Sequence, residues 1–443
     1  MRIACILLAV SAAARAQDAR GPLPLSLKRA VELALSPEGS TAIQLSAEAL
    51  KQARERSLET RAALLPDFES SVSYQNRTEN LAALGLGQGL IIPIPGFHFP
   101  TFVPPFTTFD ARLTGTQSIF DFGSIRRFQA SKAGVAAARQ DSENAAEQVA
   151  AQVARAYLWA LKAGADVDTA QANVTLSEAV LVQAQNQKTA GTGTGIEITR
   201  ARVQLANDRQ HLLEAQNARR AADLRLLRAI GLRLDTQLEL TDRMAYVPVD
   251  AVTLEQARTQ ALAARPDYKA QQERESTARL SASATKMERA PSVAAFGDYG
   301  TIGTGLNNSL PTRTYGISVK VPLWDGARRD ARRVESESQF RAEKVRTNDL
   351  KEQIELDVRL ALDELQSAED EVKVAREGLS LAENELAQAR RRYEAGVTSS
   401  IEVTDAQTRL ERARDNQTAA VYGHNVARID LAQAMGRARS AVQ

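Results

Sequence analysis

The chain of 443 residues contains one long pattern twice. Residues 190–197 read AGTGTGIE and residues 395–402 read AGVTSSIE, while Gly231 and Gly436 are separated by the same 205 positions. Solenoid repeats have periods of only about 20 to 50 residues. The sequence therefore predicts two copies of one large structural unit, and the content of that unit decides the function.

The first residues have the features of a secretory signal peptide. Arg2 precedes an apolar run at residues 3–10, and residues 14–16 have the small-x-small form of a cleavage site. We expect residues 1–16 to be removed, which takes away Cys5 and two arginines and brings the formal net charge from +2 to zero. The mature chain then has no basic excess for nucleic acid and no cysteine for a disulfide.

Each unit contains a long helical pattern followed by a turn and a second helix. Residues 124–190 contain no proline and place alanine and valine at helical spacings. At 1.5 Å per residue such a helix is roughly 100 Å long. The glycine-rich residues 191–195 interrupt it, and residues 196–230 read as a returning helix. The sequence predicts helical hairpins at 124–230 and, in the second unit, at 328–435.

Upstream of each hairpin the pattern changes from helical spacing to strict alternation. We expect strands at about 67–77 and 108–120 in the first unit, and at about 292–303 and 312–323 in the second. Segments of about ten residues that are apolar on one face and polar on the other are typical of membrane β-barrels. Beyond the signal peptide, no apolar run is long enough for a spanning helix.

Four strands cannot close a barrel, and open strand edges are not tolerated in lipid. Several chains must therefore contribute, with two giving eight strands and three giving twelve. An eight-stranded barrel is filled by its own side chains. The charged residues on the polar face fit a water-filled lumen better, which favours three chains or more: Glu69, Asp110, Arg112 and Lys320.

With these features the chain resembles the TolC-like outer membrane efflux proteins. The marks are the duplicated order of short helix, strand pair and long hairpin, the strand-to-helix turns at 120–123 and 324–326, and the second tip at 393–406. The resemblance covers essentially the whole mature chain. It implies a homotrimer with a twelve-stranded β-barrel in outer membrane lipid and a twelve-helix α-barrel in the periplasm. It also implies a periplasmic adaptor and an inner membrane transporter as partners.

The expected organisation follows. Residues 1–16 are the signal peptide, residues 17–235 the first outer-membrane-efflux repeat, and residues 236–443 the second. The fold is mostly α with a membrane β-barrel part. The expected function is that of a channel which passively conducts substrates delivered by the transporter and adaptor. The transported substrate is not indicated by the sequence.

The resemblance also assigns roles to four residues near the tips. Glu402 and Asp405 match family positions whose acids line the periplasmic constriction, and Tyr393 and Glu197 match positions that hold neighbouring helices together at the closed end. Thr398 stands where some members have an arginine that ties the tip shut, so that lock is absent. A solvated helix face is the alternative account of the two acids.

The two hairpin turns are the expected contact surface for the adaptor. The first is not a nucleotide loop, because no Lys-Ser/Thr follows it and no strand precedes it. The residues expected to contact the adaptor are Gly191, Gly193, Gly195, Gly396, Thr398 and Ser399.

Residues 81–107 connect the first two strands and are rich in proline and phenylalanine. They form either an outer loop packed on itself and its symmetry mates or a flap over the exit of the barrel. Two other classes of protein remain. An exported coiled-coil adaptor or scaffold would have similar hairpins, but only one, beside lipoyl-like and β-barrel modules. An autonomous porin would need many more strands.

Chemical sites are not indicated by the sequence. The three histidines, His98, His211 and His424, are scattered without metal-ligand spacing, and no Ser/His/Asp or Cys/His set can be assembled. We expect no metal, no cofactor and no enzymatic activity.

Overall fold

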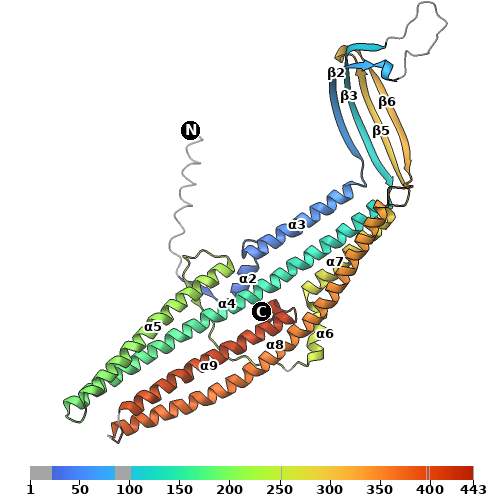
Figure 1. Cartoon of the computed structure of the whole chain (residues 1–443). Coiled ribbons are helices and arrows are strands. Elements are labelled where there is room, and N and C mark those ends of the chain that lie inside the picture. Colours follow the sequence, from blue (N-terminus) through green and yellow to red (C-terminus); the bar gives the residue numbers. More distant parts are fainter. Residues whose placement is uncertain (1–21, 85–100, 251, 396, 399, 443) are drawn as a thin grey trace, which may run out of the picture. The chain divides into compact units, whose positions relative to one another are not determined.

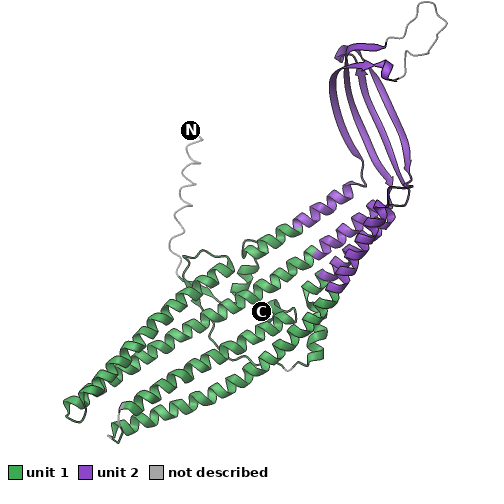
Figure 2. Cartoon of the chain, in the orientation of Figure 1, with its two compact units in different colours: residues 1–50, 138–270, 347–443 green, residues 51–137, 271–346 purple. Residues whose placement is uncertain are grey.

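The computed structural model describes residues 22–84, 101–250, 252–395, 397–398 and 400–442 (Figure 1). The predicted signal peptide lies outside the described residues. The chain divides into two compact units (Figure 2), one comprising 51–137 and 271–346 and the other the described parts of 1–50, 138–270 and 347–443. Within the described ranges, no helix is both long and apolar enough to cross a membrane.

The helices are α2 (Leu27–Leu35), α3 (Thr41–Ala62), α4 (Phe122–Thr189), α5 (Gly195–Ile230), α6 (Leu254–Ala264), α7 (Pro266–Met287), α8 (Arg328–Glu394), α9 (Ser400–Ala434) and α10 (Ala438–Val442). The strands are β1 (Leu23–Leu25), β2 (Asp67–Asn80), β3 (Phe102–Phe120), β4 (Leu238–Leu240), β5 (Ser292–Gly303) and β6 (Ser309–Lys320). Short 3₁₀ turns follow β2 at Leu81–Leu84 and β5 at Leu306–Asn308.

The unit coloured purple in Figure 2 contains a four-stranded antiparallel sheet in the order β2-β3-β5-β6. Its register places apolar side chains of all four strands on one face. For example, Leu113 pairs with Tyr299, and Ala295 with Ile317. The apolar side chains on this face include Phe68, Val72, Tyr74, Phe109, Leu113, Tyr299, Tyr315, Ile317 and Val319. Because side chains alternate along a strand, the polar residues between them share the opposite face.

Two glycines of the sheet are covered by cross-strand aromatic rings. A Cβ at Gly115 would lie 2.9 Å from the ring of Phe68 on the apolar face, and a Cβ at Gly316 would lie 3.0 Å from the ring of Phe296 on the polar face. Glycines beside aromatic residues let a sheet curve while the ring replaces the missing side-chain contact. The sheet therefore has one such pair on each face.

The strands differ in extent from the sequence prediction. β3 begins at Phe102 rather than near 108 and pairs with the end of β2, so the connection expected at 81–107 is shorter. Pro104 and Pro105 fall where β3 pairs only with β2 and where the register shifts. Proline has no N–H to donate to a neighbouring strand, so it is tolerated only at such bulges and edges, where that hydrogen bond is not needed. Residues 85–100 lie outside the described part.

The last strand is also displaced from the prediction. β6 covers Ser309–Lys320 instead of about 312–323, and Lys320 pairs with Ser292, the first residue of β5. The residues before Ser292 belong to the turn after α7, so Val321 and the residues beyond it have no ladder partner.

The other unit contains most of the helical hairpins α4–α5 and α8–α9, whereas α4 up to residue 137 and α8 up to residue 346 belong to the unit with the sheet. Its clusters of buried side chains consist largely of alanine and valine with single large residues such as Tyr157, Leu226 and Tyr393. Small side chains let helices approach closely, as the alanine-rich pattern predicted. Tyr157 of α4 is fully buried and its hydroxyl donates to Leu25 O at 2.8 Å and Asp242 Oδ2 at 2.9 Å.

The repeated glycines end the two returning helices. Gly231 and Gly436 have φ of 85° and 69°, a left-handed conformation that favours glycine. A Cβ at Gly231 would lie 2.5 Å from Gly39 O, and one at Gly436 would lie 2.8 Å from Arg265 Cα. Both the backbone conformation and the close packing therefore explain why glycine occurs at this position in each repeat.

Candidate functional site

The candidate site consists of the two hairpin turns and the side chains around them, which we call the tip cluster: Gln187, Gly191, Gly193, Glu197, Arg392, Tyr393, Thr398, Glu402 and Asp405. All belong to the unit that contains the hairpins. Gly195 is the first residue of α5, and a Cβ there would lie 3.8 Å from Lys188 Nζ, an ordinary contact. Of the residues expected to contact an adaptor, Gly396 and Ser399 lie outside the described residues.

The first turn is closed by its backbone. Gln187 O accepts hydrogen bonds from the N–H groups of Thr192 and Gly193, both at 3.0 Å, and Gly191 has a φ of 76°. A Cβ at Gly193 would lie 3.0 Å from Gln187 Cβ and from Lys188 N. The glycine run is therefore needed for a tight turn.

Glu197 holds the start of α5. Its carboxylate accepts a hydrogen bond from the backbone N–H of Thr194 at 2.9 Å. This contact satisfies a helix N-terminal donor and places a negative charge at the positive end of the helix. The side chain expected to link neighbouring helices thus caps its own helix in this chain.

Tyr393 connects two helices of the hairpins. Only 4% of it is exposed, and its hydroxyl donates to Gln187 Oε1, so that α8 is tied to α4. Burial and the nearby negative charge of Glu197 raise the pKa of Tyr393, against the opposing hydrogen bond with Gln187. The sequence prediction did not include Gln187. Its only signal was a polar residue in the last turn of the long helix.

Glu402 is held within its own hairpin. Its Oε1 lies 3.3 Å from Arg392 Nη1 on α8, and its Oε2 accepts a hydrogen bond from the Thr398 hydroxyl. Arg392, which the sequence prediction did not include, therefore supplies the cation beside Glu402. Asp405, one turn further along α9, is exposed, and no contact of its carboxylate is seen among the described residues. The two predicted gate acids therefore have different electrostatic environments.

A group of carboxyls lies between α5 and α9. Asp208 of α5 is 3% exposed and accepts hydrogen bonds from the Ser177 hydroxyl and from Gln204 Nε2, the latter at 2.9 Å. Glu411 of α9 faces it, and burial, followed by the charges of Asp208 and Asp415, raises the pKa of Glu411 to about 7. The sequence prediction missed this group, because only the packing of the hairpins brings these acids together.

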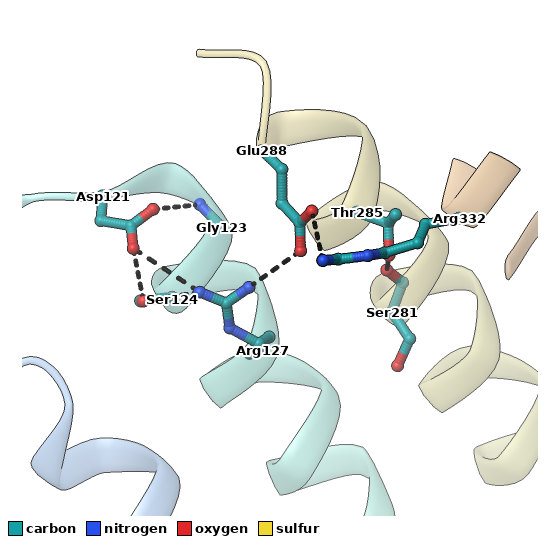
Figure 3. A network of polar contacts seen from close by, with 8 residues as sticks. All are labelled: Asp121, Gly123, Ser124, Arg127, Ser281, Thr285, Glu288 and Arg332. Carbon is teal, nitrogen blue, oxygen red and sulfur yellow. Dashed lines mark hydrogen bonds and ion pairs between the residues drawn. The ribbon is translucent and has the colours of Figure 1, made fainter. Parts of the chain in front are cut away.

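The start of α4 is fixed by a polar network in the unit that contains the sheet (Figure 3). Asp121 accepts hydrogen bonds from Gly123 N at 2.9 Å and from the Ser124 hydroxyl at 2.5 Å, which caps the helix. Arg127 Nη1 and Arg332 Nη1 lie 3.5 and 3.1 Å from the carboxylate of Glu288. The network therefore joins the residue that follows α7 to both long helices.

The polar face of the sheet carries an ion triad. Arg112 Nη2 lies 2.8 Å from Asp110 Oδ2, and Arg112 Nη1 lies 3.1 Å from Asp298 Oδ1 on the neighbouring strand. Gly300 leaves room for this arrangement, since a Cβ there would lie 2.4 Å from Arg112 Cβ. Asp110 and Arg112, both expected on the polar face, are thus brought together with Asp298, which was not singled out. Within the described ranges no group of three or more metal-binding side chains is present.

Comparison with known proteins identifies the class of protein. The family model described as outer membrane efflux protein matches residues 35–232 and, a second time, residues 257–437. The chain therefore belongs to the outer membrane efflux protein family, a family of TolC-like transport channels.

Individual relatives agree with this class. The pyoverdine export outer membrane protein OpmQ of Pseudomonas putida is 25% identical over 338 residues, which is 74% of this chain and 71% of OpmQ. The solved structure of a membrane protein from Pseudomonas aeruginosa is similar with a TM-score of 0.80 and 16% identity, covering 93% of each chain. The Campylobacter jejuni CmeC outer membrane channel gives a TM-score of 0.76 and 17% identity, covering 93% of this chain and 86% of CmeC.

Proposed function

We propose that the protein is the outer membrane channel of a tripartite efflux or secretion system. In this role a homotrimer passively conducts substrates delivered by an inner membrane transporter and a periplasmic adaptor. The observation that carries the proposal is the four-stranded sheet with one apolar face and two unpaired edges, β2 and β6. Lipid requires such edges to be paired, and pairing β6 of one copy with β2 of the next closes a barrel.

The polar face of the sheet supports three copies rather than two. Three copies give a twelve-stranded barrel, wide enough for a water-filled lumen, whereas eight strands leave room only for side chains. The ion triad of Arg112, Asp110 and Asp298 on the polar face fits such a lumen. Three copies of the two hairpins give a matching barrel of twelve helices.

Exposed apolar residues on the helices support self-association. Those of α5 are spaced by seven to eleven residues and lie along one side: Ile196, Val203, Leu213 and Leu224. Those of α8 include Leu356, Leu360, Val374 and Leu381. Burial of such side chains against a neighbouring copy is favourable by about 25 cal/mol per Å² of apolar surface.

The tip cluster is proposed as the periplasmic gate and as the adaptor contact. Tyr393 and Glu197 stabilise the helices at the turns, while Glu402 and Asp405 form the acidic part of the gate. Since Glu402 is paired with Arg392, three exposed Asp405 carboxylates supply most of the negative potential at the constriction. The adaptor contact is assigned to the turns, at Gly191, Gly193, Gly195, Gly396, Thr398 and Ser399.

Fractionation and extraction of the expressed protein test the assembly. We expect it in the outer membrane fraction and, after mild detergent extraction, as a trimer by light scattering. A soluble periplasmic monomer would rule out the channel.

A matched pair of substitutions tests which face of the sheet meets lipid. Val319→Arg puts a cation on the apolar face and should weaken insertion, by about 2–4 kcal/mol if the position lies near the midplane of the membrane. Ser318→Arg, its neighbour on the polar face, should leave the yield of inserted trimer nearly unchanged. The reverse order of yields would mean that the polar face meets the lipid.

A further inference from the structure

His424 of α9 is buried without a hydrogen-bond partner. None of it is exposed, and among the described residues no atom accepts from or donates to Nδ1 or Nε2. A buried polar group without a partner costs free energy, and a buried imidazolium without a partner costs much more. The protein therefore tolerates this ring in its neutral form.

The segment between the repeats covers this histidine. We call residues 241–250 the strap; they connect β4 to the second repeat and form no regular secondary structure after Leu240. The ring of Tyr246 lies 4.5 Å from that of His424, centroid to centroid, at an interplanar angle of 39°. Asn425 Nδ2 donates to Ala245 O at 2.9 Å, which fixes the strap beside the ring.

Apolar packing completes the cover. Met244 and Tyr246 of the strap pack against Val372 of α8 and Val421 of α9. The imidazole can therefore reach water only when Tyr246 and its neighbours leave the surface of the α8–α9 hairpin.

The charged groups around the ring come from both helices. On α8, Glu369 favours the protonated ring, whereas Arg376 adds a positive charge 4.9 Å from the centroid of Tyr246. On α9, Arg428 disfavours protonation. From the strap, the ring of Tyr246 lies against the imidazole. Burial is the largest effect and, with the charge of Arg428, lowers the pKa of His424 below its ordinary value against the opposing charge of Glu369.

We propose that His424 is an acid-sensitive latch, which holds the strap on the α8–α9 hairpin while the ring is neutral and releases it when the ring is protonated. This latch would act whether or not the protein conducts substrates. A group whose pKa is lower in the docked state loses docking stability as the pH falls below its free value, near 6.5 for histidine. The ratio of released to docked strap then rises up to about tenfold per pH unit until the docked ring also protonates.

Release of the strap loosens the contact between the two repeats. The strap is the covalent connection from the first repeat to α6 and contacts α8 and α9 through Tyr246 and Met244. Its release at acid pH would leave the α8–α9 hairpin freer to move against the rest of its unit.

Hydroxyl radical footprinting of the full-length protein between pH 7.5 and 4.5 tests the latch. Mass spectrometry reads oxidation of Met244 and Tyr246 directly, without a label. Oxidation of Met244 and Tyr246 should rise several-fold as the pH falls. The rise should follow the titration of a single proton, with a midpoint below pH 6.5. Tyr393, which is 4% exposed and whose hydroxyl donates to Gln187 outside the strap, is the internal reference and should stay protected.

Variants distinguish release of the strap by protonation of His424 from a non-specific loosening of the structure at acid pH. His424→Phe should abolish the rise, and His424→Gln, which also cannot take up a proton, is the second variant. His211→Phe removes an exposed histidine on α5 and should leave the rise intact. Unchanged oxidation of Met244 and Tyr246 in the parent protein down to pH 4.5, or an equal rise in both His424 variants, would overturn the proposal.

Discussion

Glu197 and Glu402 occupy the same place in the two repeats but have different partners. In the first repeat the carboxylate caps its own helix through the backbone N–H of Thr194. In the second it pairs with Arg392 across the turn and accepts from the Thr398 hydroxyl. Both turns have an equivalent backbone hydrogen bond, from Thr192 N–H to Gln187 O in the first and from Val397 N–H to Arg392 O in the second. The difference teaches that the second turn adds an ion pair between side chains to this shared backbone closure. The second turn is therefore the one whose closure responds to salt.

The glycine that ends the returning helix in both repeats gives the largest expected effect on the free energy of unfolding. Gly231→Ala and Gly436→Ala each force a side chain into a left-handed conformation and into contact with backbone atoms. We expect a loss of roughly 2–4 kcal/mol in the free energy of unfolding for each, measured by urea denaturation. If either substitution lowers the free energy of unfolding by less than about 1 kcal/mol, the two glycines do not have the same structural role.

The next effect concerns an acid that only the second repeat carries. Because burial and neighbouring acids raise the pKa of Glu411 to about 7, its ionisation destabilises the folded state as the pH rises above its ordinary value near 4.5. Glu411→Gln should therefore stabilise the protein by roughly 1–2 kcal/mol at pH 8, after discounting for partial exposure, and by almost nothing at pH 4.

Thermal unfolding at the two pH values measures this difference. Glu214→Gln, on an exposed part of α5, is the control and should have little effect at either pH. Equal effects of Glu411→Gln at pH 8 and pH 4 would show that the carboxyl is not strained by its neighbours.

A smaller effect separates the equivalent glutamates directly. Glu402→Gln removes the ion pair with Arg392 and should cost about 0.2–1 kcal/mol at low salt, with the difference disappearing at high salt. Glu197→Gln should be almost neutral, since glutamine also accepts from the N-cap N–H. Distances between spin labels placed on either side of each turn, measured at low and high salt, would show whether the turn opens. A salt-dependent distance across the first turn would contradict the comparison.

The smallest effect on stability is expected at Asp405. Its exposed carboxylate makes no contact among the described residues, so Asp405→Asn should not change the melting temperature. In planar bilayers, however, it should weaken block by multivalent cations more than Glu402→Gln does, because Arg392 already offsets the charge of Glu402. Equal block in both variants would show that the ion pair does not persist in the assembled channel.

The sequence indicated the architecture because its signals are local and periodic. The helix pattern of residues 124–190 and the alternation around Phe109 and Tyr315 depend on which face of an element is buried, and α4 and the strands have these patterns. The extent of β3 could not be read in this way, because the prolines before Phe106 suggested a loop. Pairing with β2 alone, at a register shift, allows them in a strand.

The candidate site was only partly predictable. The sequence and its resemblance to a family singled out Tyr393, Glu402 and Glu197, but their partners Gln187 and Arg392 are ordinary polar residues of long helices. Nothing local distinguishes them from solvated side chains, since the contact between Tyr393 and Gln187 depends on how two hairpins pack.

By itself, the sequence determined the duplicated helices and strands, the glycines that end α5 and α9, and the two faces of the sheet. These follow from backbone conformation and from the periodic burial of apolar side chains, which each segment carries in its own residues. Only the tertiary structure decided which charges meet. The pairs are Glu402 with Arg392, Glu411 with Asp208, and His424 with Tyr246. Each joins residues of different helices or segments, and its energy depends on burial and separation that no local pattern specifies.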